Sequence, residues 1–344
     1  MNESHTSPHR DTYWDTVKAL LIFLVILGHS VQFFIYHGWN MKGFWDDPVF
    51  KSIYLFHMPL FMLISGYFAA KSLAKRGKLA LLRYFQRLAL PCVGMGLLYL
   101  ILAEPDKSLF RSVCSGFKAL WFLIVLFECV ILYYIMQLKQ DIWYKSTIFV
   151  LSILVAILFG STPPIPRLWP HADMFTYLWP IFVLGAGLAK KGVTHEHINW
   201  KLGTFCTGLY LIGFTFFQSD WYVYVRPLAF QIDSLLIDLF RSGVALAGCC
   251  MALWAGKYIH RWVGKYPIIQ NIGKATLALY VLQTPFFDKS KILSNYLPEQ
   301  MGYLDAACLT LCLVLALYGI YLASRRIPII SQLLYGESIT RNAD

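Results

Sequence analysis

The residues with the clearest chemical potential surround the first apolar stretch of the sequence: Arg10, Asp15, Lys18 and His29. Almost wholly apolar residues separate Lys18 from His29. In a helix, eleven steps of about 100° come to roughly three turns plus 20°, so Lys18 and His29 share one face, about 16 Å apart along the axis. An imidazole so placed can accept and return a proton, and the cation near the helix start can bind an anion.

Two interpretations of this buried histidine are open. Ionisable groups deep in an apolar helix usually face a cavity or a polar partner, which favours a functional His29. The alternative is a packing histidine that hydrogen-bonds a neighbouring helix. His57, before Pro59, either converges with His29 or bonds backbone groups that the proline leaves free. Glu128 is the clearest acidic residue inside an apolar stretch, and we expect it to orient an imidazole or to neutralise a cation.

Further charged residues could bind an anion beside Lys18. Asp15 lies one helical turn before Lys18, so it either orients that cation or caps the helix start. Arg83 and Arg87 are also one turn apart and can contact one anion together. The alternative for these arginines is a role in membrane topology alone, because they belong to a cation-rich segment, residues 71–87.

The composition defines the elements that must position these groups. With 58% hydrophobic residues, 14% charged residues and a mean hydropathy of +0.54, the chain is not an ordinary soluble domain. Long uninterrupted apolar runs favour an all-α bundle of transmembrane helices over a barrel. We expect one integral membrane domain, residues 1–344, with about ten spans. The predicted spans are 19–36, 48–70, 88–103, 118–138, 146–160, 175–189, 202–217, 232–256, 275–288 and 304–323.

The distribution of cations predicts the orientation of the bundle. With the N-terminus inside, about two thirds of the 30 Lys and Arg residues lie on the cytoplasmic side, and both termini are cytoplasmic. Topology and anionic lipid then account for the net charge of +11 without a nucleic-acid partner. Most of the eight cysteines lie in apolar runs and resemble small hydrophobes. The absence of CxxC and HExxH motifs predicts no metal.

Three predicted outer loops, residues 37–48, 161–180 and 218–231, are rich in aromatic residues and proline. Such rings are typical membrane-interface anchors, and they also stack on sugars. Near the third loop, Asp238 and Arg241 either pair with each other or join Asp233 in an acceptor site. Ser65 and Gly66 favour close helix packing over a nucleophilic role.

Several segments resemble one family of membrane enzymes. They are RDTYWDTVKALLIFLVILGHS (10–30), FHMPLFMLISGYFAA (56–70), RYFQRLALP (83–91), LWFLIVLFE (120–128), IFVLGAG (181–187) and GKATLALYVLQTPF (273–286). The chain is similar to the acyltransferase family 3 proteins, particularly the sugar O-acetyltransferase branch that includes fucose 4-O-acetylase-like proteins. It differs at the Arg83-x3-Arg87 pair, which is Arg-x2-Arg in the family. It also has Gln283 where many relatives carry a late histidine, which weakens a role for that helix.

The resemblance implies transfer of an acetyl group from cytoplasmic acetyl-CoA to a hydroxyl of a cell-surface polysaccharide or its lipid-linked precursor. It implies a bacterial inner membrane. It also implies that His29 is the general base, with His57 and Glu128 as further catalytic candidates. Residues expected to bind coenzyme A are Arg10, Asp15, Lys18, Arg83 and Arg87. The competing hypotheses are a transporter or flippase of a glycan or lipid-linked substrate, and a structural membrane subunit.

Overall fold

The computed structural model describes residues 11–38, 42–102, 108–161, 169, 171–226, 231–288 and 301–337, so Arg10 lies outside the described residues. The regular elements in these ranges are all helices. They are α1 (Tyr13–Ser30), η1 (Val31–Ile35), η2 (Lys42–Trp45), α2 (Pro48–Tyr54), α3 (His57–Arg76), α4 (Lys78–Leu102), α5 (Leu109–Ala119), α6 (Trp121–Met136), α7 (Ile142–Ser161), α8 (Ala172–Lys190), η4 (His195–His197), α9 (Trp200–Phe216), η5 (Ser219–Trp221), α10 (Ile232–Val263), α11 (Pro267–Lys274), α12 (Thr276–Asp288), α14 (Tyr303–Ser324) and α15 (Pro328–Tyr335).

The predicted all-α membrane bundle is confirmed. Within the described ranges, 7 helical segments are long and apolar enough to cross a membrane, and the pair α5–α6, bent by 80°, would be an eighth. The helix α12 is apolar but shorter. Every predicted span overlaps a helix of the structure. The number of ten spans and the cytoplasmic position of both termini stay predictions.

Local sequence signals account for the sharp connections around α2 and α3. The Asp47 carboxylate accepts hydrogen bonds from the Val49 and Phe50 amides at 2.9 and 2.8 Å, and Pro48 follows it at the first helical position. At the other end of α3, Gly77 has a φ of 49°, which glycine adopts without a steric penalty. The chain can therefore turn abruptly from α3 into α4.

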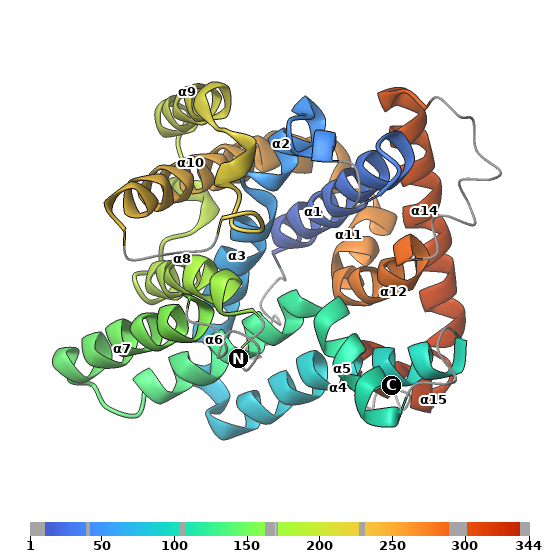
Figure 1. Cartoon of the computed structure of the whole chain (residues 1–344), viewed down its shortest axis with the longest axis horizontal. Coiled ribbons are helices and arrows are strands. Elements are labelled where there is room, and N and C mark those ends of the chain that lie inside the picture. Colours follow the sequence, from blue (N-terminus) through green and yellow to red (C-terminus); the bar gives the residue numbers. More distant parts are fainter. Residues whose placement is uncertain are drawn as a thin grey trace, which may run out of the picture.

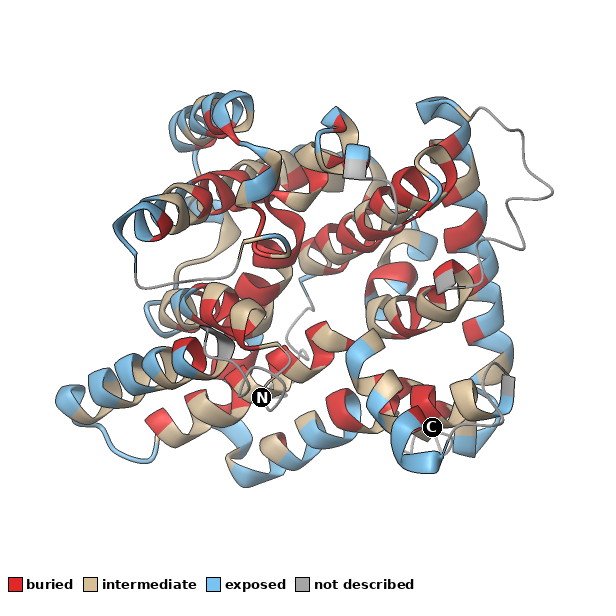
Figure 2. Ribbon diagram, in the orientation of Figure 1, coloured by how far each residue is buried: buried red, intermediate tan, exposed pale blue. Residues whose placement is uncertain are grey.

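Helices α1 and α3 cross the middle of the bundle, and the other helices surround them (Figure 1). The closest pairs are α3 with α8, α9 with α10, α1 with α11 and α14, and α4 with α5 and α15. Buried residues concentrate on the central helices, while α7, α9 and α14 turn exposed faces outward (Figure 2). Large apolar side chains such as Leu151, Phe205 and Leu315 lie on these outer faces, as expected of surfaces that contact lipid.

Glycines allow close backbone contact between α3 and α8. A Cβ atom added at Gly66 would lie 2.1 Å from the Phe182 carbonyl oxygen, and one added at Gly185 would lie 2.0 Å from the Leu63 carbonyl oxygen. The two backbones therefore approach each other through both glycines. The packing interpretation of Gly66 is confirmed, and this contact fixes α3, which carries His57, against α8.

Two glycines of α8 provide a test of this contact. We expect Gly185→Ala to lower the thermal unfolding midpoint of the detergent-solubilised protein by about 5 °C or more, because the new methyl group overlaps the α3 backbone. Gly187→Ala is the matched control, since a Cβ atom there meets nothing within 4 Å. It should leave the midpoint unchanged or raise it, because alanine favours helix. Equal midpoints for both variants would contradict the close contact.

Candidate active site

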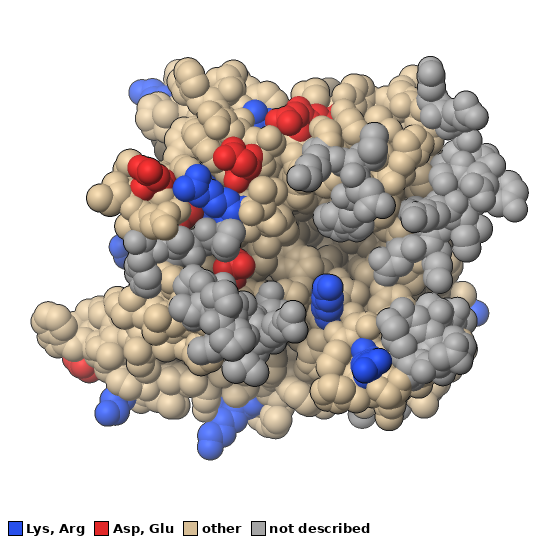
Figure 3. All heavy atoms as spheres, in the orientation of Figure 1, with Lys and Arg blue, Asp and Glu red and all other residues tan. Residues whose placement is uncertain are grey.

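A cavity of about 830 Å³ lies inside the bundle, in the size range of ligand sites. Its wall includes residues of α1, α2, α3, α4, α5, α6 and α12, together with residues at the start of α8. The face of the molecule in Figure 3 carries few charged side chains and is hollowed near its centre. The polar residues on the cavity wall are His29, His57, Ser115, Lys118, His171, Asp173, Gln283 and Thr284.

The helix α1 presents one face to this cavity. Val25, His29 and Phe33 line the wall at intervals of four residues, as the helical period requires. Lys18 lies seven residues before Val25 on the same face, and its Nζ is 2.9 Å from the Asp15 carboxylate. The predicted pairing of Asp15 with Lys18 is therefore confirmed as an ion pair.

Three neighbours hold the His29 imidazole in place. Its Nδ1 is hydrogen-bonded to Gln32 Oε1 at 3.3 Å, and the Tyr54 hydroxyl lies 3.4 Å from the same nitrogen. The Phe287 ring packs against the imidazole, with ring centres 5.2 Å apart. A Cβ atom at Gly28 would lie 2.7 Å from the Tyr54 ring, so glycine is needed for Tyr54 to approach α1. With its proton on Nδ1, His29 keeps the lone pair of Nε2 for accepting a proton.

The widened turn η1, a π-helix that begins directly after Ser30, contains Gln32. π-helical turns inside α-helices occur frequently at functional sites. Gln32 is fully buried, and the hydrogen bond described for its side chain joins it to His29. This local break in the helix therefore supports the histidine that the sequence singled out.

His57 lies on the same cavity as His29. Its Nδ1 donates to the Ile53 carbonyl at 2.9 Å, across the break between α2 and α3. A backbone hydrogen bond is thus present, but its acceptor is not the Leu55 carbonyl, which Pro59 leaves free four residues earlier. His57 and His29 line the same cavity. As in His29, the bond at Nδ1 leaves Nε2 as the accepting nitrogen.

The structure adds cavity residues that sequence reasoning did not select. Lys118 lies in the last turn of α5, and His171 and Asp173 lie at the start of α8. Burial lowers the pKa of His171 and nearby Lys118 lowers it further, while a hydrogen bond to the Phe117 carbonyl opposes both. His171 and Asp173 belong to the predicted outer loop 161–180. The aromatic content of this loop was the sequence signal that could have identified them.

Gln283 is the other addition. It lines the cavity and is 2% exposed. A glutamine at this position argues against a role for α12, since many members of the family that the chain resembles carry histidine there. The structure nevertheless brings α12 to the cavity, with Tyr280, Thr284 and Phe287 beside Gln283 on the wall.

Besides Asp15 and Lys18 near the start of α1, three predicted site residues do not line the cavity. Glu128 is not on the cavity wall, and its Oε1 accepts a hydrogen bond from the Trp169 indole at 3.0 Å instead of contacting an imidazole. Arg83 and Arg87 are exposed on α4. That helix packs against α5 and α15, whereas α1 with Lys18 packs against α11 and α14. Neither arginine lines the cavity, although Tyr99 of the same helix does.

The charged residues of α10 form a structural support. Arg241, 2% exposed, contacts the Asp238 carboxylate at 2.7 Å, which confirms their pairing. Arg241 also donates to the Arg226 carbonyl at 2.9 Å. This bond anchors the segment before α10, which carries Tyr224 to the cavity wall.

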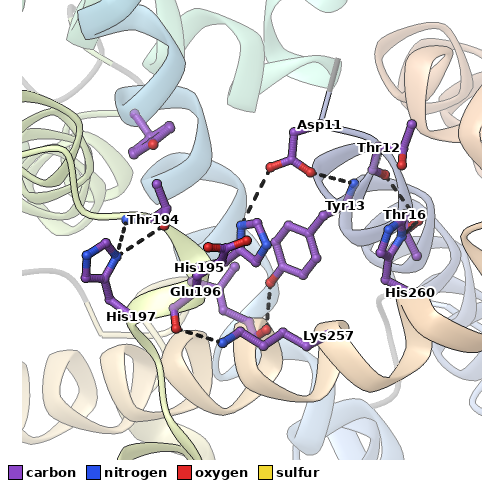
Figure 4. Close-up of polar contacts among 12 residues, drawn as sticks. Asp11, Thr12, Tyr13, Thr16, Thr194, His195, Glu196, His197, Lys257 and His260 are labelled. Atoms are coloured by element: carbon purple, nitrogen blue, oxygen red, sulfur yellow. Dashed lines mark hydrogen bonds and ion pairs between the residues drawn. The ribbon is translucent and has the colours of Figure 1, made fainter. Parts of the chain in front are cut away.

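A second polar cluster fixes the start of α1 (Figure 4). The Tyr13 ring stacks on the His195 ring at 3.6 Å between ring centres, and Asp11 approaches the same imidazole at 3.7 Å. Thr16 Oγ1 lies 2.8 Å from His260 Nδ1 on α10. The helix that carries Lys18 and His29 is thus anchored at its first turn to η4 and α10.

Fold and site together define a multi-pass helical membrane protein with an internal cavity lined by histidines. The chain belongs to the acyltransferase 3 family, because the family described as an acyltransferase domain matches residues 11–324. The protein is therefore a membrane acyltransferase.

Two relatives carry the same description. Nodulation protein NolL of Mesorhizobium japonicum is 28% identical over 307 residues, which cover 81% of this chain and 77% of the relative. Nodulation protein NolL of Sinorhizobium fredii is 52% identical over 67 residues, 20% of this chain and 18% of the relative. No solved structure is significantly similar to the chain.

The side of the membrane on which the cavity opens can be tested with a native thiol. Cys114 is free and exposed on α5, next to Ser115 of the cavity wall. We expect a membrane-impermeant maleimide to label it in sealed right-side-out vesicles, because its helix end is predicted to lie outside. Cys114→Ser should remove this labelling. Labelling of Cys114 in inside-out vesicles alone would place the cavity mouth on the cytoplasmic side and contradict the predicted orientation.

Proposed function

We propose that this protein transfers an acetyl group from cytoplasmic acetyl-CoA to a hydroxyl of a carbohydrate on the outer side of a bacterial inner membrane. The main support is His29. In a member of a membrane acyltransferase family, this histidine lies on the internal cavity with Nδ1 hydrogen-bonded and Nε2 available as an acceptor. A base held in this way suits transfer to a hydroxyl.

In the proposed reaction, Nε2 of His29 removes the proton of the acceptor hydroxyl as its oxygen attacks the thioester carbonyl. The carbon–sulfur bond then breaks, and the departing sulfur takes the proton back from the imidazolium. Gln32 accepts the Nδ1 hydrogen bond throughout and stabilises the cationic ring. His57 is the second imidazole of the cavity and a candidate to contact the acceptor.

The donor is proposed to enter from the end of α1 that carries Lys18. The ion pair with Asp15 holds the Lys18 ammonium group in a defined position at the first turns of the helix. Arg83 and Arg87, exposed on α4, would contact the phosphates of coenzyme A outside the cavity. The slender thiol arm would then extend along α1 toward His29, about 16 Å from Lys18.

The acceptor is proposed to enter from the opposite end. Trp45, Trp121 and Tyr224 line the cavity and offer flat apolar surfaces of the kind on which sugar rings stack. Lys118 and Asp173 add a cation and a carboxylate to the same wall. The ammonium group can bind acidic substituents, and the carboxylate can accept hydrogen bonds from hydroxyl groups. A cell-surface polysaccharide or its lipid-linked precursor fits this wall.

The function is tested by incorporation of labelled acetyl from acetyl-CoA into envelope glycans. Membranes that contain the wild-type protein should show incorporation, and His29→Ala at matched abundance should lower the rate by about a thousandfold or more, because the base is lost. Binding of coenzyme A, measured separately, should stay within about threefold of wild type.

The outcomes separate three explanations. Equal incorporation by both proteins would eliminate His29 as the base. Loss of both transfer and coenzyme A binding would indicate misfolding of the variant. No incorporation by the wild type, in a host whose glycans are acetylated, would overturn the proposed reaction.

The donor site generates a separate prediction. Lys18→Gln and Arg87→Gln should each raise the apparent KM for acetyl-CoA by about 5–50-fold, because each removes a charge-assisted contact with phosphate. Lys75→Gln is the control, since Lys75 is an exposed cation of the same cation-rich segment with no assigned role. The kinetics should be measured at matched protein levels. An unchanged KM in a variant would remove that residue from the donor site.

A further inference from the structure

Gln283 is a buried amide whose hydrogen-bonding capacity the protein leaves partly unused. Its side chain is 2% exposed and lines the cavity. Its Oε1 has no hydrogen-bond partner among the described residues. The oxygen and nitrogen of a side-chain amide have nearly the same shape, so either can take this position. Because leaving such a group unpaired costs free energy, the arrangement indicates that a bound molecule supplies the partner.

Gln283 and His29 line the same cavity, and Phe287 is a neighbour of both. Phe287 lies four residues after Gln283, on the same face of α12, and its ring packs on the His29 imidazole. Side chains four residues apart in a helix are about 5–6 Å apart at Cβ. A carbonyl group held beside His29 is therefore within reach of the Gln283 side chain.

The hydroxyl groups nearby are already engaged. The Thr284 hydroxyl donates to the Tyr280 carbonyl at 3.2 Å. The Tyr54 hydroxyl contacts Nδ1 of His29. Gln283 differs from both, because it has a polar group with no described partner in the same part of the cavity.

We propose that the Gln283 amide N–H donates a hydrogen bond to the thioester carbonyl oxygen as the acetyl group is transferred. When the acceptor oxygen attacks the carbonyl carbon, the π electron pair moves onto the thioester carbonyl oxygen, and His29 takes the hydroxyl proton. When the tetrahedral intermediate collapses, the carbon–sulfur bond breaks, and the sulfur leaves with the bonding pair and takes the proton from His29. Gln283 gains and loses no proton, and the hydrogen bond from its N–H group is strongest when the thioester oxygen is negative.

This inference rests on the proposed function. It assigns a residue that stabilises the negative oxygen of the tetrahedral intermediate. His29 does not do this, since a base activates the nucleophile only. A neutral amide is suited to this task inside an apolar bundle, because burying it does not require the burial of a net charge.

Three substitutions test the role of Gln283 in the labelled-acetyl assay at pH 8. Gln283→Glu keeps the size and the oxygens but removes the N–H donor, and Gln283→Leu removes both polar ends. Each should lower the apparent maximal rate by about 100–1,000-fold, with the KM for acetyl-CoA changed by less than about threefold. Gln283→His restores an N–H donor and should retain a rate at least about tenfold above Gln283→Glu.

Gln140→Leu is the matched control, because Gln140 is exposed between α6 and α7 and bonds only Lys145 in the described structure. It should keep the wild-type rate. All variants are compared at equal abundance and with equal thermal midpoints, and if Gln283→Leu does not fold, the ratio of Gln283→His to Gln283→Glu decides the question.

The outcomes have distinct meanings. A Gln283→Glu rate near that of the wild type, or equal rates for the His and Glu variants, would overturn the donor role while leaving the proposed function intact. A higher KM with an unchanged maximal rate would make Gln283 a binding residue and would overturn the proposal equally. No transfer by the wild type would remove the proposed function and the role of Gln283 with it.

Discussion

A polar side chain inside a membrane bundle must find its partners within the protein, because lipid offers none. His29 meets this constraint through Gln32 on its own chain segment, Tyr54 from α2 and Phe287 from α12. Two of these partners require a specific backbone feature: the widened turn η1 for Gln32, and the missing side chain of Gly28 for Tyr54. The position of one imidazole therefore depends on how three helices meet.

The rest of the bundle holds those helices in register. The close backbone contact of Gly66 and Gly185 fixes α3 on α8, so that His57 of α3 and Asp173 of α8 reach the same cavity. The Arg241–Asp238 pair ties α10 to the segment that carries Tyr224. The Asp238 and Arg241 side chains, which the sequence presents as part of a possible acceptor site, thus serve as a support, because the guanidinium pairs with this carboxylate and bonds the Arg226 carbonyl.

Sequence reasoning was most successful within single helices. The helical period related Lys18 to His29 and Asp15 to Lys18 without any knowledge of the fold. It could not relate different helices, because the spacing along one chain segment does not determine which segments become neighbours. Depth in an apolar run made Glu128 a candidate, but its partner Trp169 comes from a loop. Gln283 was discounted for its residue type, yet tertiary packing placed it on the cavity.

The two ends of α1 face different chemical requirements. At its start, Lys18 is paired with Asp15 and the helix is anchored by Tyr13 and Thr16, an arrangement that resists movement. Farther along, His29 lies on a cavity whose wall combines aromatic rings with Lys118 and Asp173. A rigid cationic end suits a ligand with a fixed polyphosphate head, whereas a wall of rings and mixed charge suits acceptors of varied shape. In the proposed reaction, the length of α1 would keep the charged head of the donor about 16 Å from the imidazole that moves the proton.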